Sequence, residues 1–340
     1  MQLFTRTHST TTTTTASRRA RRLARRTTLT ACAITALAAP AVASAADTLV
    51  VPDPFANEVT ALDGTIVWLS GFDSDEERNT DQVLMQRTGG VIKRVDGAPR
   101  ASYDSIDLGR DSSGKLVLTY TRCSQTRCTH LRDDLRGKRK SFKHLTLERC
   151  ELEQAPAVWG TRLAYGLHCH KPSKAFDKKR SGLYVKAGAG SPRRLRSPSK
   201  ANGPFIRARD LRRTRVAAIA GFRDAYSFSE TVGGNGLRSL RVGLPEGGAS
   251  STVQMDVSLP STNVMWTLVG SKTVEDPRRV SIVKTLSDCY ERETLVGSPA
   301  DPFAFPATDL AADGTRLYLV VPRAGIIEHD FAPAGGCKKL

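Results

Sequence analysis

The sequence lacks the short motifs that identify common classes of enzyme. It contains no G-x-S-x-G nucleophile elbow, no H-E-x-x-H zinc motif and no glycine-rich loop of the kind that cradles phosphate. Aromatic residues make up only 6% of the chain, and the basic stretches contain few of them for stacking on bases. No nucleic-acid-binding motif is present either. These absences argue against a familiar catalytic site and against nucleic acid as a partner.

Long apolar runs are lacking after residue 45, so the sequence predicts no transmembrane segment in the mature chain. One shorter apolar run, from about Leu29 to Val42, follows paired arginines and precedes the A-x-A sequence Ala43-Ser44-Ala45. This order is that of a secretory signal peptide cleaved after Ala45, with a disordered, basic and threonine-rich leader before it. We therefore expect residues 1–45 to be removed and the protein to be exported, either secreted or associated with the cell envelope. The export route stays open, because paired arginines also suit twin-arginine export.

The remaining chain is repetitive. Apolar strands that follow a turn signal recur with spacings of 50, 47, 53, 49 and 52 residues. A near-constant period of this length is typical of propellers and solenoids. Each unit has short alternating or apolar segments separated by Gly, Asn, Asp and Ser, with no convincing helical period. The strand centres are Trp68, Leu118, Tyr165, Ala218, Thr267 and Leu319.

Six such units predict an all-β fold, a six-bladed β-propeller of four-stranded blades, in a single domain over residues 46–340. The last unit is one strand short, whereas residues 48–51 form a strand without a partner before the first unit. Placing this N-terminal strand in the last blade closes the ring and removes the open edges. The expected third strands are Gln82–Gln86, Leu183–Lys186, Leu237–Val242 and Val280–Lys284, and the expected fourth strands are Val91–Val95, Phe142–Leu147 and Arg193–Arg196.

Two segments, Asp309–Val321 and Glu58–Ser70, share the pattern of an inner strand, A-x-D-G and an apolar strand. This pattern resembles the repeat of TolB-type (WD40-like) six-bladed β-propellers, and the resemblance extends over essentially the whole mature chain. The units at Ala208–Ala220 and Leu259–Gly270 depart from it because they lack the Asp-Gly turn. Members of this fold serve as protein-binding modules, periplasmic scaffolds and, less often, hydrolases or lyases, so the resemblance implies the fold and leaves the activity open.

Six cysteines follow residue 45, and an even number in an exported chain favours disulfide bonds. Cys150 and Cys169 are equidistant from a turn expected at Trp159-Gly160, which places them opposite each other on paired strands. Cys123 and Cys128 flank a short connection, which leaves the last two cysteines to pair. The expected bridges are Cys123–Cys128, Cys150–Cys169 and Cys289–Cys337.

A zinc site is the alternative for some of these cysteines, because three histidines lie near them in sequence. No C-x-x-C pair is present, and Cys169 points away from its neighbours His168 and His170 if the segment is a strand. We therefore expect no metal and no cofactor.

Basic residues gather in the middle of the chain. Residues 132–215 contain 23 Lys and Arg against seven Asp and Glu, whereas the net charge after residue 45 is only +10. Meander topology brings the first and third turns of each blade to one end, so these residues are expected to form one basic face over three adjacent blades. Such a face attracts anionic partners and makes their binding salt-dependent. Its expected members are Arg136, Lys138, Arg139, Lys140, Arg193, Arg194, Arg209, Arg212, Arg213 and Arg215.

Acidic residues provide a competing interpretation. Asp104, Asp107 and Asp309 lie on or near expected inner strands, where propeller glycosidases hold their carboxylates. The same positions in non-catalytic propellers cap turns or bond to the next blade, so we expect no catalytic residue. The sequence favours a secreted, monomeric, non-enzymatic binding or scaffold propeller at the cell envelope, whose partner is an anionic polymer or an acidic protein. The alternative is a polysaccharide-directed hydrolase or lyase, and a solvated basic surface with no dedicated partner also stays open.

Overall fold

The regular elements of the described chain are all β-strands, as expected, and none of its residues is helical. The computed structural model describes residues 47–71, 82–98, 101–124, 127–142, 145, 147–152, 154–198, 206–221, 225–242, 254–271, 279–297 and 306–340. The predicted signal peptide lies outside these residues. Residues 45–340 form one compact unit. Within the described ranges, no helix is long and apolar enough to cross a membrane.

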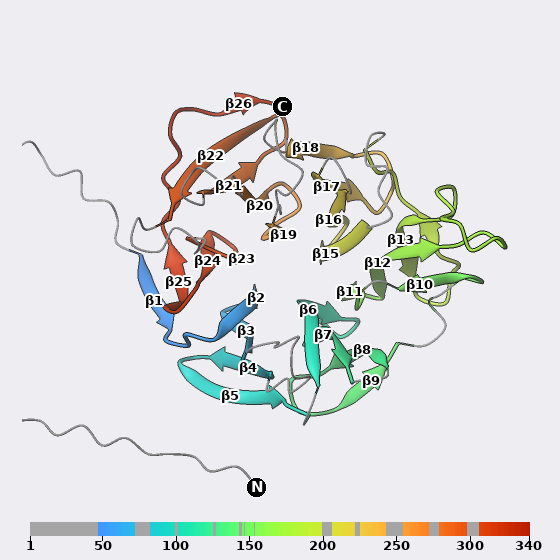
Figure 1. The fold of residues 1–340 in the computed structure, drawn as a ribbon, viewed down its shortest axis with the longest axis horizontal. Helices are drawn as coiled ribbons and strands as arrows, with labels where there is room; N and C mark the ends of the chain where they lie inside the picture. The colour runs from blue at the N-terminus through green and yellow to red at the C-terminus, as the bar shows by residue number, and fades with distance from the viewer. Residues whose placement is uncertain are drawn as a thin grey trace, which may run out of the picture. The chain divides into compact units, whose positions relative to one another are not determined.

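The strands of this unit form a propeller-like ring of sheets (Figure 1). Two four-stranded antiparallel sheets lie next to each other in the ring. The first contains β2 (Ala56–Leu62), β3 (Thr65–Ser70), β4 (Val83–Thr88) and β5 (Val91–Asp96). The other contains β23 (Asp309–Asp313), β24 (Arg316–Val321), β25 (Gly325–His329) and the N-terminal strand β1 (Thr48–Val51).

Two further sheets are also antiparallel meanders. One contains β15 (Ile206–Arg212), β16 (Arg215–Gly221), β17 (Ala225–Thr231) and β18 (Arg238–Val242). The other contains β19 (Gln254–Ser258), β20 (Met265–Ser271), β21 (Arg279–Thr285), β22 (Cys289–Val296) and the short C-terminal strand β26 (Lys338–Lys339).

The fifth sheet has nine strands and consists of two meanders. They meet where β6 and β11 pair in parallel over two residue pairs, Trp159 with Arg110 and Gly160 with Asp111. The first meander is β6 (Ser102–Asp111), β7 (Leu116–Cys123), β8 (Cys128–Asp133) and β9 (Arg139–Ser141). The second is β11 (Ala157–Gly160), β12 (Arg162–Cys169), β13 (Gly182–Ala187) and β14 (Arg193–Arg194), with β10 (Cys150–Leu152) also paired to β12.

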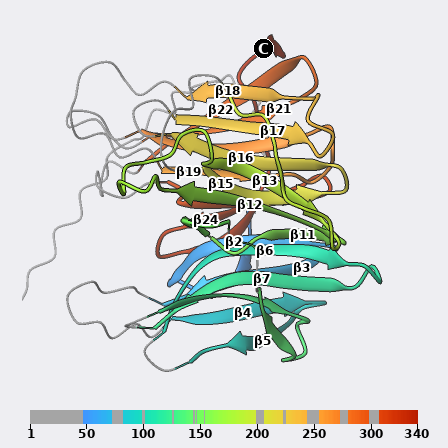
Figure 2. The ribbon, with the colours of Figure 1, turned by 90° about the vertical axis from the view of Figure 1, so that its right-hand side faces the viewer.

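The first strand of each meander faces the centre of the ring. Strands β2, β6, β11, β15, β19 and β23 contact one another in this order, and β23 contacts β2. The side view shows strands running across the molecule from one end to the other, so that hairpin turns gather at two opposite ends (Figure 2). One end carries the turns after each first and third strand, and the other end carries the remaining connections.

The hydrophobic core lies between neighbouring sheets. Strand β3 shows how the sequence supplies it, because Val67 and Trp68 point to opposite faces and are both buried. Val67 packs with Leu108 and Leu118 of the next sheet, and Trp68 packs with residues of the last sheet. The sequence of a strand that is covered on both faces is therefore a continuous apolar run.

Hydrogen bonds from backbone to side chain also join the central strands. Thr60 Oγ1 of β2 accepts from Leu108 N of β6 at 3.1 Å, and Ser258 Oγ of β19 accepts from Ala312 N of β23 at 3.1 Å. Between β6 and β11 the backbones approach so closely that Gly109 is required. A Cβ at residue 109 would lie 1.9 Å from the Val158 carbonyl oxygen.

The expected closure of the ring by residues 48–51 is confirmed as a strand pairing. Strand β1 pairs antiparallel with β25, and Leu49 lies opposite Ile327. His329 of β25 adds a polar link, because its two ring nitrogens lie 2.8 Å from Asp47 Oδ1 and 2.9 Å from Glu293 Oε2.

Two expected strands were wrong. Residues 237–242 were expected as a third strand, but β18 is the fourth strand of its sheet because Ala225–Thr231 already forms the third. Residues 142–147 were expected as a fourth strand, whereas β9 ends at Ser141. The turn after β8 ends at Lys138, so the fourth strand begins to pair with β8 at Arg139. It therefore lies earlier in the chain than the expected residues 142–147.

Three disulfide bonds occur in the described chain, and they join the pairs expected from the sequence: Cys123–Cys128, Cys150–Cys169 and Cys289–Cys337. Cys150 lies directly opposite Cys169 in the pairing of β10 with β12. Such bonds persist in oxidising, extracellular environments.

Candidate functional site

Three of the central strands are distorted at the same end of the ring. The pairing of β2 shifts between Ala56 and Glu58, that of β6 between Asp104 and Asp107, and that of β15 between Ala208 and Asp210. In β6 the irregularity holds Ser105 at φ 60°, a left-handed conformation that is costly for a residue other than glycine. Bulges redirect side chains and are common beside functional sites.

The redirected side chains meet around the guanidinium of Arg209. Its Nε lies 2.7 Å from Asp256 Oδ1, and Nη1 lies 3.3 Å from Glu58 Oε1. Asp309 Oδ1 is 3.8 Å from Nη2. Four central strands, β2, β15, β19 and β23, thus contribute one side chain each to a cluster of three carboxyl groups and one arginine.

These carboxyl groups also hold the neighbouring backbone. Glu58 accepts hydrogen bonds from Ser105 N at 3.1 Å and from Ile106 N at 3.2 Å, which links β2 to β6. Asp309 Oδ2 accepts from Val59 N at 2.6 Å, which links β23 to β2. The cluster therefore has a structural role in the ring in addition to any role in binding.

A second arginine lies deeper in the ring. Arg212 Nη1 is 3.1 Å from Asp210 Oδ1 and donates to Leu108 O at 2.6 Å. Its guanidinium carbon also lies 5.5 Å from the centroid of the Trp159 ring. Asp107 lines a chamber of about 10 Å³ beside this pair, and its Oδ2 finds no hydrogen-bond donor among the described residues.

Burial leaves several of these carboxyl groups with a raised pKa. Burial, together with the charges of Asp104 and Asp256, raises the pKa of Glu58 to about 7 in spite of Arg209. Burial and the neighbouring Asp256 hold the pKa of Asp309 well above its usual range. Burial raises the pKa of Asp107 and of Asp210 in the same way. Arg209 and Arg212 therefore do not fully compensate the negative charge of the carboxyl groups around them, and these residues together are called the centre below.

A cavity of about 720 Å³ opens at the end of the ring where the bulges occur. Glu58, Asp104, Asp309 and Arg209 lie in its polar lining. Apolar parts of the wall come from Phe55, Leu69, Tyr103 and Ile219 among others. The volume is within the range of pockets that take small molecules or short polymer segments. Arg209 lines both this cavity and the inner chamber.

Three members of the predicted basic face are instead interior residues. Arg209 and Arg212 belong to the centre, and Arg215 is buried in its own sheet, where it donates to Ser229 Oγ and to Gly236 O. The prediction placed them around a turn, but β15 extends to Arg212 and the turn is only Arg213-Thr214. Their charges are directed inward and cannot form part of an exposed face.

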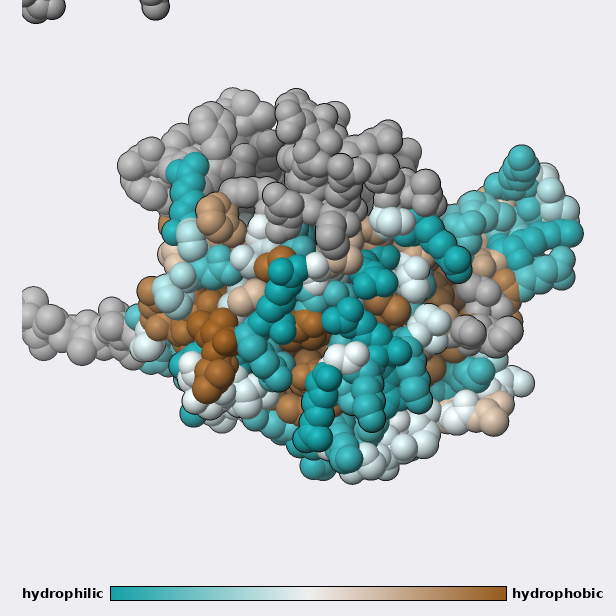
Figure 3. All heavy atoms as spheres, turned by 90° about the horizontal axis from the view of Figure 1, so that it is seen from below, coloured by the Kyte–Doolittle hydropathy of each residue, from teal (hydrophilic) through white to brown (hydrophobic). Residues whose placement is uncertain are grey.

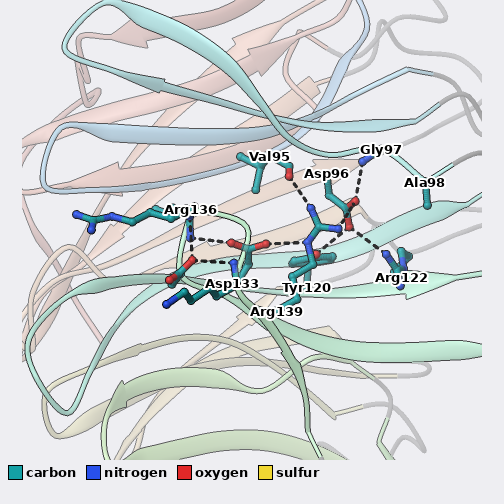
Figure 4. A network of polar contacts seen from close by, with 12 residues as sticks. Val95, Asp96, Gly97, Ala98, Tyr120, Arg122, Asp133, Arg136 and Arg139 are labelled. Atoms are coloured by element: carbon teal, nitrogen blue, oxygen red, sulfur yellow. Dashed lines mark hydrogen bonds and ion pairs between the residues drawn. The ribbon is translucent and has the colours of Figure 1, made fainter.

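A fourth member, Arg139, is held in a clamp between two sheets (Figure 4). Its Nη1 lies 2.9 Å from Asp96 Oδ1 and its Nε lies 2.9 Å from Asp133 Oδ2, while Nη2 donates to Val95 O. Asp96 also accepts from Tyr120 Oη at 2.8 Å and lies 3.4 Å from Arg122 Nη1. The charge of Arg139 is therefore neutralised where it lies.

The other six predicted residues are exposed. Hydrophilic side chains cover much of the face drawn in Figure 3. Arg193 donates to Gly233 O, and Arg194 donates to Lys178 O. None of the six forms an ion pair with another part of the chain that the structure describes. They are Arg136, Lys138, Lys140, Arg193, Arg194 and Arg213.

Of the acidic residues singled out in the sequence, Asp104 and Asp309 both line the cavity, whereas Asp107 lies below it in the inner chamber. Sequence reasoning missed Glu58, Asp210 and Asp256. A signal was present, because an acidic residue followed by an apolar one recurs within five central strands. The five are Glu58, Asp107, Asp210, Asp256 and Asp309.

The zinc alternative has no support in the described residues. The three cysteines of this alternative, Cys123, Cys128 and Cys169, are in disulfide bonds, and no three His, Cys, Asp or Glu side chains in these ranges are arranged to hold a metal ion. His168 and His170 lie close together, with ring centroids 4.6 Å apart, but His170 Nδ1 is engaged with Lys174 O.

No protein-family model and no curated protein matches the sequence. Similar solved structures include a GH74 xyloglucanase from Xanthomonas campestris, with 11% identity, a TM-score of 0.43 and coverage of 82% of this chain and 45% of that chain. An acylaminoacyl peptidase from Pyrococcus horikoshii has 10% identity, a TM-score of 0.42 and coverage of 81% and 50%. The β-propeller domain of Nup133 from Vanderwaltozyma polyspora has 8% identity, a TM-score of 0.32 and coverage of 79% and 80%.

The chain spans half or less of the length of the xyloglucanase and of the peptidase. Likeness at this level of identity and TM-score carries no argument about activity. The description of the fold rests on the strand order and the ring of sheets.

Proposed function

We propose that this chain is an exported, TolB-type β-propeller of six blades that binds an anionic partner at the cell envelope and has no catalytic activity. The proposed number of blades rests on the nine-stranded sheet. Its two meanders, β6–β9 and β11–β14, are joined by only two parallel residue pairs. Counted separately, they bring the number of meanders to six, and one central strand belongs to each.

Export is proposed from two independent features. The first is the arginine-rich, apolar and A-x-A order of residues 1–45. The second is the use of cysteine, because three disulfide bonds are typical of oxidising compartments. An envelope location would expose the protein to anionic polymers and acidic proteins.

The observation that carries the binding proposal is the set of exposed basic residues without ion pairs in the described chain. Arg136 and Lys138 lie in the turn after β8, and Arg213 lies in the turn after β15, so all three are at the same end of the ring. Arg193 approaches that end from β14, where it contacts the turn after β17. Exposed charges of one sign attract an anionic surface without requiring a deep pocket.

Sedimentation with isolated cell envelopes over a salt series tests this proposal. We expect binding at low salt that weakens steeply as salt rises, and that is lost when anionic polymers are extracted from the envelopes. Replacing Arg136, Lys138 and Arg213 by Ala should weaken binding. A matched control replaces Lys171, Lys174 and Lys178 by Ala, because these exposed lysines lie in the connection from β12 to β13 at the other end. Equal losses in both triple variants would contradict a dedicated basic face.

A polysaccharide-directed hydrolase or lyase is the second candidate, favoured by the carboxyl groups in the cavity. A group with a raised pKa such as Glu58 can act as a general acid, and Asp104 lines the same space. Release of reducing ends or unsaturated products from envelope polysaccharides, abolished by Asp104→Asn, would support an enzyme. Unchanged polysaccharide after prolonged incubation would leave the binding protein as the better description.

A further inference from the structure

The carboxyl groups around Arg209 outnumber the single arginine that pairs with them, although two more arginines, Arg207 and Arg323, also line the cavity at the end of the ring. Arg209 is shared among Asp256, Glu58 and Asp309, at N–O distances from 2.7 to 3.8 Å. Asp104 lines the same cavity, is exposed and forms no ion pair with the described residues. Among the described residues, Arg209 is therefore shared by three carboxyl groups. Glu58 and Asp309 line the cavity together with Asp104, whereas Asp256 lines the inner chamber.

The space directly beneath repeats this imbalance. Asp107 and Asp210 share Arg212, and Asp107 Oδ2 is buried and finds no donor in the described chain. A buried carboxyl oxygen without a donor is costly and favours the arrival of a hydrogen-bond donor or a cation. Arg209 separates this chamber from the open cavity, since it lines both.

We propose that the cavity binds an organic cation, an ammonium or guanidinium group on an apolar stem, whose charge docks on the cavity side of Glu58, Asp104 and Asp309. This site lies at the end of the ring opposite the exposed turns of the basic face, and it is independent of the envelope binding proposed above. The stem would lie along Phe55, Leu69 and Ile219, which provide apolar wall.

An organic cation suits the site better than a metal ion. No three acidic, cysteine or histidine side chains in the described ranges are placed to coordinate a metal. The carboxyl oxygens already accept hydrogen bonds from a guanidinium and from backbone N–H groups. An ammonium group can donate to the same oxygens in the same way.

The outer part of the cavity has the opposite charge. Arg207 lies two residues before Arg209 on β15, closer to the mouth, and Arg323 lines the cavity from the connection between β24 and β25. These arginines disfavour a cation at the mouth, whereas the carboxyl groups favour it on the floor. A ligand with a second, anionic group would therefore place that group outward, towards Arg207.

Raised pKa values fit this arrangement. Protons on Glu58 and Asp309 neutralise the floor in the absence of a ligand, and an incoming cation replaces them. Binding should therefore strengthen as pH rises from 5 to 8. The charged groups that line the cavity are the carboxyl groups Glu58, Asp104 and Asp309 and the arginines Arg207, Arg209 and Arg323, and Asp256 pairs with Arg209 from the inner chamber.

Three probes of equal length test the proposal: hexylamine, 6-aminohexanoate and hexanoate, titrated calorimetrically into the purified protein at pH 7.5 and low salt. We expect hexylamine and 6-aminohexanoate to bind and hexanoate not to. Asp104→Asn should weaken both amines about tenfold, the effect of losing one charge-assisted hydrogen bond. Arg207→Gln should weaken only 6-aminohexanoate. Glu148→Gln serves as the matched control, because Glu148 is highly exposed and distant in sequence from the cavity.

Asp104→Asn is the decisive variant because Asp104 is exposed, and its replacement preserves the backbone links that Glu58 provides. Binding of hexanoate in preference to hexylamine would overturn the proposal, as would amine binding that Asp104→Asn leaves unchanged. Cadaverine and a capped tripeptide containing lysine then separate two sources of the same chemistry, a free amine and a basic side chain of a peptide. Envelope sedimentation of Asp104→Asn should be unaffected, so failure of one proposal is distinguishable from failure of the other.

Discussion

Two clusters of arginine and carboxylate hold this ring together, and they differ in their balance of charge. The clamp between β5 and the sheet of β7–β9 contains Asp96 and Asp133 with Arg139 and Arg122, two acids for two bases. The centre contains Glu58, Asp256, Asp309, Asp107 and Asp210 with Arg209 and Arg212, five acids for two bases.

The surroundings of the two clusters differ as well. In the clamp, Asp96 accepts from Tyr120, Gly97 and two arginines, so that its oxygens are fully used. In the centre, Asp107 keeps an oxygen without a donor among the described residues, and a cavity of about 720 Å³ adjoins Arg209. The balanced cluster is explained by stability alone, whereas the unbalanced cluster beside a cavity is the basis of the ligand site proposed above.

Breaking the clamp should have the largest effect on stability. Asp96→Ala leaves Arg139, Arg122 and the Tyr120 hydroxyl without their common acceptor. We expect the free energy of unfolding in urea to fall by about 4 kcal/mol, as for other buried ion pairs that lose one partner. Glu148→Gln, at an exposed site, should change it by less than about 0.5 kcal/mol. A loss of the same small size for Asp96→Ala would show that the clamp contributes little.

The surplus of carboxyl groups at the centre should make the free energy of unfolding depend on pH. The pKa of Glu58 is about 7 in the folded protein against 4.5 ordinarily, so the folded state binds more protons than the unfolded state between these values. This contribution to stability is fully present below pH 4.5 and is lost as pH rises to 7, by about 3 kcal/mol. The raised pKa values of Asp107, Asp210 and Asp309 act in the same direction.

Urea unfolding at intervals from pH 4.5 to 8 measures this slope. Glu58→Gln should reduce the slope of the free energy of unfolding against pH, because glutamine does not titrate. Asp96→Ala should lower stability but leave the pH dependence caused by Glu58 unchanged. An identical slope in wild type and Glu58→Gln would show that Glu58 is ionised in the folded protein throughout this range.

A hydrogen bond between uncharged groups of two central strands provides a further contrast with the two charged clusters. Thr60→Val removes the acceptor of Leu108 N, which lies between β2 and β6 in a buried position. We expect a loss of about 1–2 kcal/mol, independent of pH, because a buried N–H loses its partner and no charge is changed. Thr129→Val on the half-buried part of β8 is the control, measured by the same unfolding experiment. A pH-dependent loss in Thr60→Val would mean that the central carboxyl groups are coupled to this link.

The smallest effect on stability is expected at the exposed basic residues. Replacing Arg136 and Lys138 by Ala should change the free energy of unfolding by less than about 0.5 kcal/mol. Arg139→Ala, one residue further along the chain, should be clearly destabilising because it breaks the clamp. Thermal unfolding of both variants checks this contrast, and similar midpoints would contradict it.

Much of the fold was predictable because it depends on local patterns. The all-β class follows from short alternating segments, and the pairing of Cys150 with Cys169 follows from their equal distance to one turn. The addition of β1 to β25 followed from a surplus strand before the first unit and a missing strand in the last unit. These features need no knowledge of how side chains are directed at the centre.

The centre was predicted less well because bulges interrupt the alternation of its strands. Arg209 and Arg212 were assigned to an exposed turn, since the pattern of β15 did not reveal the shift between Ala208 and Asp210. Glu58 follows a similar shift in β2, so that its inward direction could not be derived from period two. Arg139 was misjudged for another reason, because its partner Asp96 comes from a different sheet, 43 residues away in sequence.

The most direct test of the uncompensated centre is the number of protons exchanged when hexylamine binds. Calorimetric titrations at pH 7 in two buffers of different ionisation enthalpy give this number. Because Glu58 has a pKa of about 7, we expect release of roughly half a proton or more per amine bound, and a smaller release in Glu58→Gln. Binding without proton release, or with proton uptake, would contradict the account of the centre as a surplus of carboxyl groups.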